Sequence, residues 1–195
     1  MMTIRKSRIE DIPAIMPIYD SARTFMARTG NPNQWIDGYP SVENIRNDIE
    51  NDVHYVIEHD TDGIVGAFMF RIGNDPTYDV IEGAWLNDNE YGVIHRLASN
   101  GTHRGIADLC FDYCFTQINN IRVDTHQENK VMQMGIMRYG FIHCGTIFCH
   151  NGTPRLAFQL SILPNLISFD LQYSINSRLS SSAPMKSSFT TTLSL

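Results

Sequence analysis

The chain has 195 residues, of which 43% are hydrophobic, and it carries a formal net charge of −6. This length and composition predict one globular domain with a sizeable core. The acidic balance argues against nucleic acid as the main partner and mildly favours cationic partners such as amines. The first residues contain no apolar signal core and no run reaches transmembrane length, so a cytoplasmic protein with no membrane partner is expected.

The N-terminal part of the sequence predicts a strand followed by two helices. A short strand is expected over Thr3–Lys6, and apolar residues then recur at helical intervals as far as Arg28. The stretch Thr29–Pro40 is rich in turn residues and is expected to be a loop. Ser41 then predicts the cap of a second helix, which extends to about Asn51.

The middle of the sequence predicts three strands. Two apolar runs, Val53–Glu58 and Ile64–Ile72, flank the turn 60–63 and indicate a β-hairpin. A loop with further aromatic residues follows, and the apolar run Val93–Ala98 is then expected to form a strand.

The sequence after this strand indicates a crossover and a closing hairpin. A helix from about His103 to Gln117 leads to a short strand at Ile121–Asp124. Strand, helix and strand in close succession predict a parallel pair with a right-handed crossover. The remaining expected elements are a helix over Glu128–Tyr139 that ends at Gly140, and a hairpin of Phe141–Cys149 and Pro154–Leu160.

The last 35 residues differ in character from the rest, because they hold ten serines and three threonines and lose the periodic apolar pattern. Residues 1–160 are therefore interpreted as one domain, and residues 161–195 as a mostly disordered tail. Residues 162–171 retain some apolar side chains, so this part of the tail could instead pack on the domain.

The strand Val93–Ala98 leads to a place suited to phosphate. It is followed by the turn 99–101, and an amphipathic helix opens near Gly105. At such a helix start, free backbone N–H groups and the positive end of the helix dipole point the same way. Arg104 and His103 lie beside it and can add cationic contacts.

The sequence resembles the GNAT superfamily of acetyl-CoA-dependent N-acetyltransferases. Residues 97–99 are similar to the end of the family's central strand, and residues 102–107 to its pyrophosphate loop, with Thr102 where the family usually has Arg or Gln. The resemblance continues at Asn129–Met132 and Gly140-Phe141 and covers roughly residues 3–159. It implies an α/β fold of the α+β type: a mixed, mostly antiparallel sheet, splayed at the cofactor strand, with helices on both faces.

The resemblance also implies that acetyl-CoA is the co-substrate and that an amine accepts the acetyl group. It implies coenzyme binding by nine residues: Leu97, Ala98, Ser99, His103, Arg104, Gly105, Ile106, Ala107 and Asn129. Asn129 could also be a simple helix-start residue. No metal is expected, because the pair formed by His126 and Glu128 is too short and isolated to argue for one. The oligomeric state stays open, with a homodimer as one option.

Acetyl transfer requires a base, because a free alkylamine with a pKa of ~10.4 is neutral in only about one molecule in 10³ at pH 7. His95 is the first candidate, since arylalkylamine acetyltransferases similarly place a histidine on this strand. A structural histidine facing a helix is the alternative. His126 is the second candidate, with a loop histidine as its alternative. The family's usual general-acid tyrosine corresponds to Ile136, which cannot donate a proton, so solvent or a group such as Tyr139 would replace it.

The acceptor pocket is expected among loops that flank the acetyl group in this fold. Four residues in those loops are candidates for substrate binding: Trp35, Tyr39, Glu82 and Trp85. Glu82 could pair with a cationic amine, while each aromatic residue could equally be a loop plug.

Three functions are open at this point. An N-acetyltransferase fits the whole pattern. A GNAT-like acyl-CoA sensor without turnover is favoured by Ile136 and Thr102. A nucleotide-binding α/β module unrelated to CoA fits the loop, but it leaves Asn129 and Gly140-Phe141 unexplained.

Overall fold

The computed structural model describes residues 1–162, and the predicted tail lies almost wholly outside this part. The described strands are β1 (Met2–Lys6), β2 (His54–His59), β3 (Gly63–Ile72), β4 (Ile81–Gly83), β5 (Gly92–Ser99), β6 (Asn120–Thr125), β7 (Ile142–Phe148) and β8 (Pro154–Ser161). The helices are α1 (Ile12–Arg28), α2 (Val42–Glu50), α3 (Ile106–Phe115) and α4 (Lys130–Tyr139), with short 3-10 helices η1 (Ile9–Asp11) and η2 (Pro76–Tyr78). None of the helices in this part is long and apolar enough to span a membrane.

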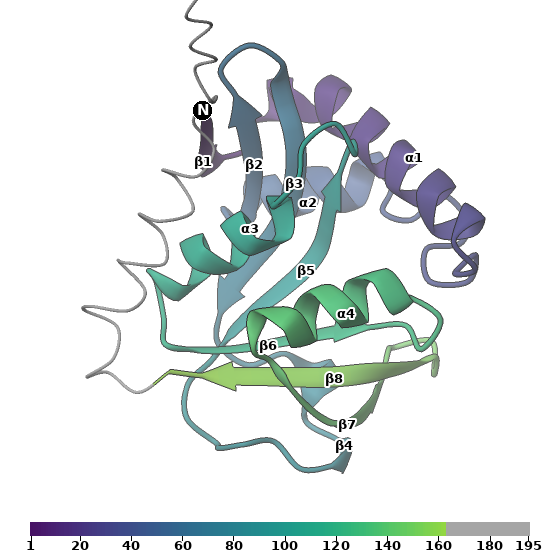
Figure 1. Cartoon of the computed structure of the whole chain (residues 1–195), viewed down its shortest axis with the longest axis vertical. Helices are drawn as coiled ribbons and strands as arrows, with labels where there is room; N and C mark the ends of the chain where they lie inside the picture. Colours follow the sequence, from purple (N-terminus) through teal and green to yellow (C-terminus); the bar gives the residue numbers. More distant parts are fainter. Residues whose placement is uncertain (163–195) are drawn as a thin grey trace, which may run out of the picture. The chain divides into compact units, whose positions relative to one another are not determined.

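The eight described strands form one sheet in the order β1-β2-β3-β5-β6-β8-β7-β4 (Figure 1). Every neighbouring pair is antiparallel except β5 and β6, which run parallel and are connected through α3. Helices α1 and α2 lie on one face of the sheet, and α3 and α4 lie on the other (Figure 1). The predicted mixed, mostly antiparallel sheet with helices on both faces is therefore confirmed.

The face of the sheet beneath α1 holds a cluster of buried apolar side chains. Ile15 and Tyr19 of α1 pack there with Ile45 of α2 and with Val56 and Ala98 of the sheet. Full burial of one valine or isoleucine side chain stabilises a fold by about 1.5–3 kcal/mol. The cluster therefore fixes α1 against β5, the strand that carries the predicted site.

Two elements differ from the sequence prediction. α3 begins later than predicted, at Ile106, because Gly105 has a φ of +77° and the chain becomes helical only after it. The segment around Glu82, predicted as a loop, forms the edge strand β4, which pairs with β7. The two strands approach closely at Gly83 and Gly145, where an added Cβ would lie 2.2 Å from a carbonyl oxygen. A strand of three residues leaves no alternating pattern in the sequence.

The sheet opens between β5 and β6. These strands pair only over Gly92–Ile94 and Ile121–Val123, after which β5 follows β3 to Ser99 while β6 follows β8. Opposite β3, β5 also carries one extra residue, and Arg96 within this bulge has a left-handed φ of +54°. A bulge bends a strand and increases its twist, so it directs the end of β5 away from β6. The predicted splay of the sheet at this strand is confirmed.

Candidate active site

A cavity of about 1460 Å³ lies at the opening between β5 and β6. Residues 94–99 of β5 form one wall, and residues 123–125 of β6 form another together with α4. The second half of α1 and the loop that follows it also line the cavity. Gly135 of α4 is a lining residue, and a Cβ added to it would meet no atom within 4 Å. The helix therefore leaves open space for a ligand at this point.

Six of the nine predicted coenzyme-binding residues line this cavity: Leu97, Ala98, Ser99, Ile106, Ala107 and Asn129. The other three, His103, Arg104 and Gly105, lie in the loop just before α3 and are not among the lining residues. The cavity thus reaches the first turn of α3, where the backbone N–H groups have no partner within the helix. Arg138 of α4 also lines the cavity and donates to Asp108 in that turn at 2.6 Å.

Asn129 connects α4 to the loop after α1. Its Oδ1 accepts a hydrogen bond from the backbone N of Met132 at 3.1 Å, and its Nδ2 donates to Oε1 of Gln34 at 2.8 Å. The first bond makes Asn129 the N-cap of α4. The second bond brings Gln34, which has no signature in the sequence, into the cavity wall.

His95 lies between two carboxylates on the cavity wall. Its Nε2 is 2.9 Å from Oδ2 of Asp75, whereas its Nδ1 is 3.5 Å from Oδ2 of Asp124, beyond the usual hydrogen-bond length of about 2.7–3.2 Å. Oδ1 of Asp75 accepts hydrogen bonds from the backbone N and the hydroxyl of Thr77. The hydroxyl of Tyr78 donates to Asp124 at 2.8 Å. One ring nitrogen is thus held firmly, and the other is not.

The protonation of the groups around His95 follows from burial and hydrogen bonding. Burial opposes ionisation of Asp75, but hydrogen bonds from His95 and Thr77 outweigh it and hold the pKa of this carboxyl below its ordinary value. Burial, together with the charge of Asp124, raises the pKa of Tyr78 well above its ordinary value, so this phenol keeps its proton. The ionised Asp75 accepts a hydrogen bond from Nε2–H, and this places the lone pair of a neutral His95 ring on Nδ1.

The bulge residue Arg96 also lines the cavity. Its Nη1 donates to Oδ2 of Asp48 in α2 at 2.7 Å, and its guanidinium lies 5.6 Å from the ring centroid of Tyr39. Burial raises the pKa of Asp48, and the charge of Arg96 opposes this shift. The pair connects the bulge of β5 to α2.

The structure separates the four residues predicted to bind the acceptor. Trp35 and Tyr39 line the cavity, whereas Glu82 and Trp85 are not among its lining residues. Glu82 lies on the edge strand β4, and the indole N–H of Trp85 donates to a backbone carbonyl of η2 at 3.1 Å. Only the first two are therefore brought together with His95.

The second candidate base His126, the candidate acid Tyr139 and the residue at the family's tyrosine position, Ile136, are not among the residues that line the cavity. His126 is buried beside the start of α4, where burial and the charge of Arg155 lower its pKa. Ile136 is fully buried, and the hydroxyl of Tyr139 donates to Asp112 of α3 at 2.7 Å. Ile136 has no hydroxyl group, and the hydroxyl of Tyr139 is directed to α3. Neither residue therefore offers a proton donor on the cavity wall.

Two residues of the His95 network, Asp75 and Asp124, are absent from the sequence prediction. Asp75 stands directly before Pro76-Thr77, a pattern typical of an aspartate that caps a turn. Asp124 lies near the carboxyl end of a strand at the opening of the sheet, where ligand-binding side chains commonly gather in α/β folds. Both signals can be read in the sequence, but neither shows that the two carboxylates meet the same histidine.

Several solved structures resemble this chain over most of its length. A GNAT-family acetyltransferase from Streptococcus agalactiae 2603 is 32% identical with a TM-score of 0.75, covering 83% of this chain and 96% of that one. A GNAT-family acetyltransferase from Listeria monocytogenes 4b F2365 is 19% identical with a TM-score of 0.61, covering 83% of this chain and 95% of that one. The yncA protein of Salmonella typhimurium, solved with its cofactor acetyl-CoA, is 15% identical with a TM-score of 0.54, covering 84% of this chain and 95% of that one. The last two similarities concern the fold alone. The sequence matches no protein-family model, and no curated protein matches it.

Proposed function

The chain belongs to the GNAT family of acetyltransferases, and from this membership we propose that it transfers the acetyl group of acetyl-CoA to an amine. The observation that carries the proposal is the cavity between the diverging strands β5 and β6, which reaches from His95 to the first turn of α3. Acetyl-CoA carries phosphates at one end and a reactive thioester at the other. The helix start of α3 suits the phosphates, and His95 lies at the end of the cavity that suits the thioester. The related YncA structure holds acetyl-CoA, which supports the same ligand here.

The free edge of β5 supports binding of the coenzyme's pantetheine arm and thioester. The backbone N of Asn100 donates to Val65 of β3 at 3.0 Å. Because N–H directions alternate along a strand, the N–H of Ser99 points to the opposite edge, which β6 has left. A donor of this type can polarise the acetyl carbonyl, and loss of one such donor costs about 3 kcal/mol in other enzymes.

The proposed base is His95. Asp75 holds the ring through Nε2, and Nδ1 is the nitrogen that accepts the amine proton. In this reaction the amine nitrogen bonds to the acetyl carbon, the carbon–sulfur bond breaks, and the amine proton passes to Nδ1. With Ile136 at the tyrosine position of the family, the leaving sulfur takes its proton from water.

Replacement of Gly105 by glutamate is expected to weaken CoA binding. A carboxylate at the start of α3 would oppose the coenzyme diphosphate, and charge effects at a helix start are worth about 0.3–2 kcal/mol, or roughly 2–30-fold in dissociation constant. Gly152→Glu is the matched control, because both glycines have a φ of +77° and open space around an added Cβ, while Gly152 lies in the β7–β8 turn. Calorimetric titration with CoA measures the effect. Equal affinities in the two variants would contradict this location of the diphosphate.

A thiol-release assay with acetyl-CoA across a panel of amines tests the function itself. The expected result is CoA-thiol release that depends on at least one amine, with the acetylated amine identified by mass spectrometry. The second candidate function, an acyl-CoA sensor, is favoured by the buried Ile136. Coenzyme binding without release from any amine would select that second function. A chain that binds no coenzyme would contradict both.

A further inference from the structure

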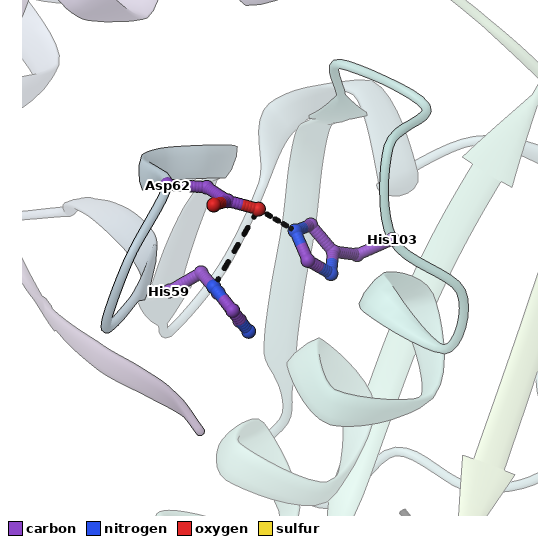
Figure 2. Close-up of side chains that lie close together, drawn as sticks. All are labelled: His59, Asp62 and His103. Carbon is purple, nitrogen blue, oxygen red and sulfur yellow. Dashed lines mark hydrogen bonds and ion pairs between the residues drawn. The ribbon is translucent and has the colours of Figure 1, made fainter.

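Three side chains of the types that bind transition metals meet outside the cavity (Figure 2). His59 is the last residue of β2, Asp62 lies in the turn between β2 and β3, and His103 belongs to the loop that leads into α3. One nitrogen of each histidine and one oxygen of Asp62 all lie within 4.8 Å of one another. Two segments that are 41 residues apart in sequence thus bring an N, N, O donor set to one point.

The geometry of the cluster is close to that of a metal site. Oδ2 of Asp62 is 2.7 Å from Nε2 of His103 and 3.6 Å from Nδ1 of His59, and Figure 2 shows the carboxylate directed towards both rings. The two imidazole rings are stacked, with centroids 4.2 Å apart and planes 28° apart. Ligands at about 2.0–2.2 Å from a tetrahedral zinc ion lie roughly 3.3–3.6 Å from each other. The distance from Asp62 to His59 lies at the upper end of this range, and coordination requires the two stacked rings to turn so that both nitrogens face one ion.

Neighbouring groups orient these ligands. The hydroxyl of Thr61 donates to Oδ1 of Asp62 at 2.7 Å and lies 3.1 Å from Nδ1 of His59, so it fixes the carboxylate beside the ring. The side chains of His59 and His103 are each 21% exposed, and that of Asp62 is 48% exposed. An ion from solvent can reach all three. The contact of His59 with Thr61 and the stacking of its ring on that of His103 hold its Nδ1 beside the carboxylate.

We propose that His59, Asp62 and His103 bind a divalent transition-metal ion of the zinc or nickel class. Two imidazoles and one carboxylate suit these ions and do not suit Mg²⁺ or Ca²⁺, which prefer oxygen ligands. Solvent completes the coordination sphere. The ion joins the β2–β3 turn to the loop that precedes α3, and it takes His103 from the residues expected to contact the coenzyme. It differs from the sequence expectation that the chain holds no metal.

Calorimetric titration of the tag-free full chain with Zn²⁺ tests this site, together with absorption spectroscopy of Co²⁺ as a coloured probe. One saturable ion per chain is expected, with visible Co²⁺ bands of a low-symmetry site. His59→Gln and Asp62→Asn should each weaken binding by at least about 10-fold, the range seen when even supporting residues of metal sites are lost. His143→Gln is the matched control, because this exposed histidine lies on β7 outside the cluster.

Two outcomes would overturn the site. One is the lack of saturable binding of Zn²⁺ or Co²⁺ by the parent chain. The other is parent-like affinity in both His59→Gln and Asp62→Asn, which would place the ion elsewhere. Far-ultraviolet circular dichroism on each variant separates loss of the ligand from loss of the fold. Thermal unfolding gives an independent readout, since at one ion concentration the Tm of the parent and of His143→Gln should rise by more than that of either cluster variant.

Discussion

His95→Ala is expected to slow acetyl transfer by at least about 100-fold near pH 7, while affinity for CoA stays close to that of the parent. The expectation follows from the hydrogen bond between Nε2 and Asp75, which leaves Nδ1 as the acceptor for the amine proton. General-base catalysis is typically worth about 10²–10⁴-fold, and alanine removes all of it. Initial rates of thiol release, measured with a responsive amine, provide the test.

The dependence of this loss on pH distinguishes a base from a structural histidine. The loss should shrink as the pH approaches the pKa of the amine, about 10.4 for an alkylamine, because the substrate then arrives already neutral. His54→Ala is the control, since His54 is buried and bonded to Ser7 and Tyr19. That variant should lose stability without changing the pH profile of the rate. Rates within a few-fold of the parent at every pH would eliminate His95, and the same profile on His126→Ala would then be the next measurement.

Most of the fold can be predicted because its signals act over short distances. Ser41 caps α2 through a hydrogen bond from the backbone N of Asn44, three residues away, and the sequence shows this pair directly. Gly63, with a φ of +70°, ends the tight turn between β2 and β3. Apolar periodicity predicts the remaining long elements. The strand β4 cannot be predicted from the sequence, because its three residues form a strand only through their pairing with β7.

The site can be predicted only in part, because its contacts depend on the fold. The sequence singles out His95 and Asn129, but it does not show that they bond to Asp75 and Gln34, which lie 20 and 95 residues away. It also gives no sign of the bulge in β5. Arg96 occupies its left-handed position, and the glycine or asparagine that would usually mark such a conformation is missing.

Arg96→Met is expected to lower the free energy of unfolding at pH 7 by about 3–5 kcal/mol, the usual cost of removing one partner from a buried ion pair. Arg96 donates to Asp48 at 2.7 Å, and the side chain of Asp48 is only 7% exposed. Methionine keeps much of the length of the side chain but leaves the carboxylate without its cation. The variant also loses the contact of the guanidinium with the ring of Tyr39. Urea unfolding followed by fluorescence measures the change.

The deficit of Arg96→Met should depend on pH in a definite direction. Burial raises the pKa of Asp48 in the folded state, so between its unfolded and folded pKa values the folded chain binds more protons than the unfolded chain. Stability in this window therefore falls as pH rises. Without the positive charge of Arg96 the folded-state pKa of Asp48 rises further, and this pH window widens. The loss of unfolding free energy in the variant should therefore be largest at neutral pH and smaller at acidic pH.

The double variant Arg96→Met/Asp48→Asn completes the test. An amide buried in place of the carboxylate removes the unpaired charge, so the double variant should unfold at a higher urea concentration than Arg96→Met alone. It should also lose the pH dependence assigned to Asp48. A midpoint for Arg96→Met equal to that of the parent at pH 7 would contradict a stabilising role for the pair. In that case the left-handed bulge of β5 would be held by its pairing with β3 alone.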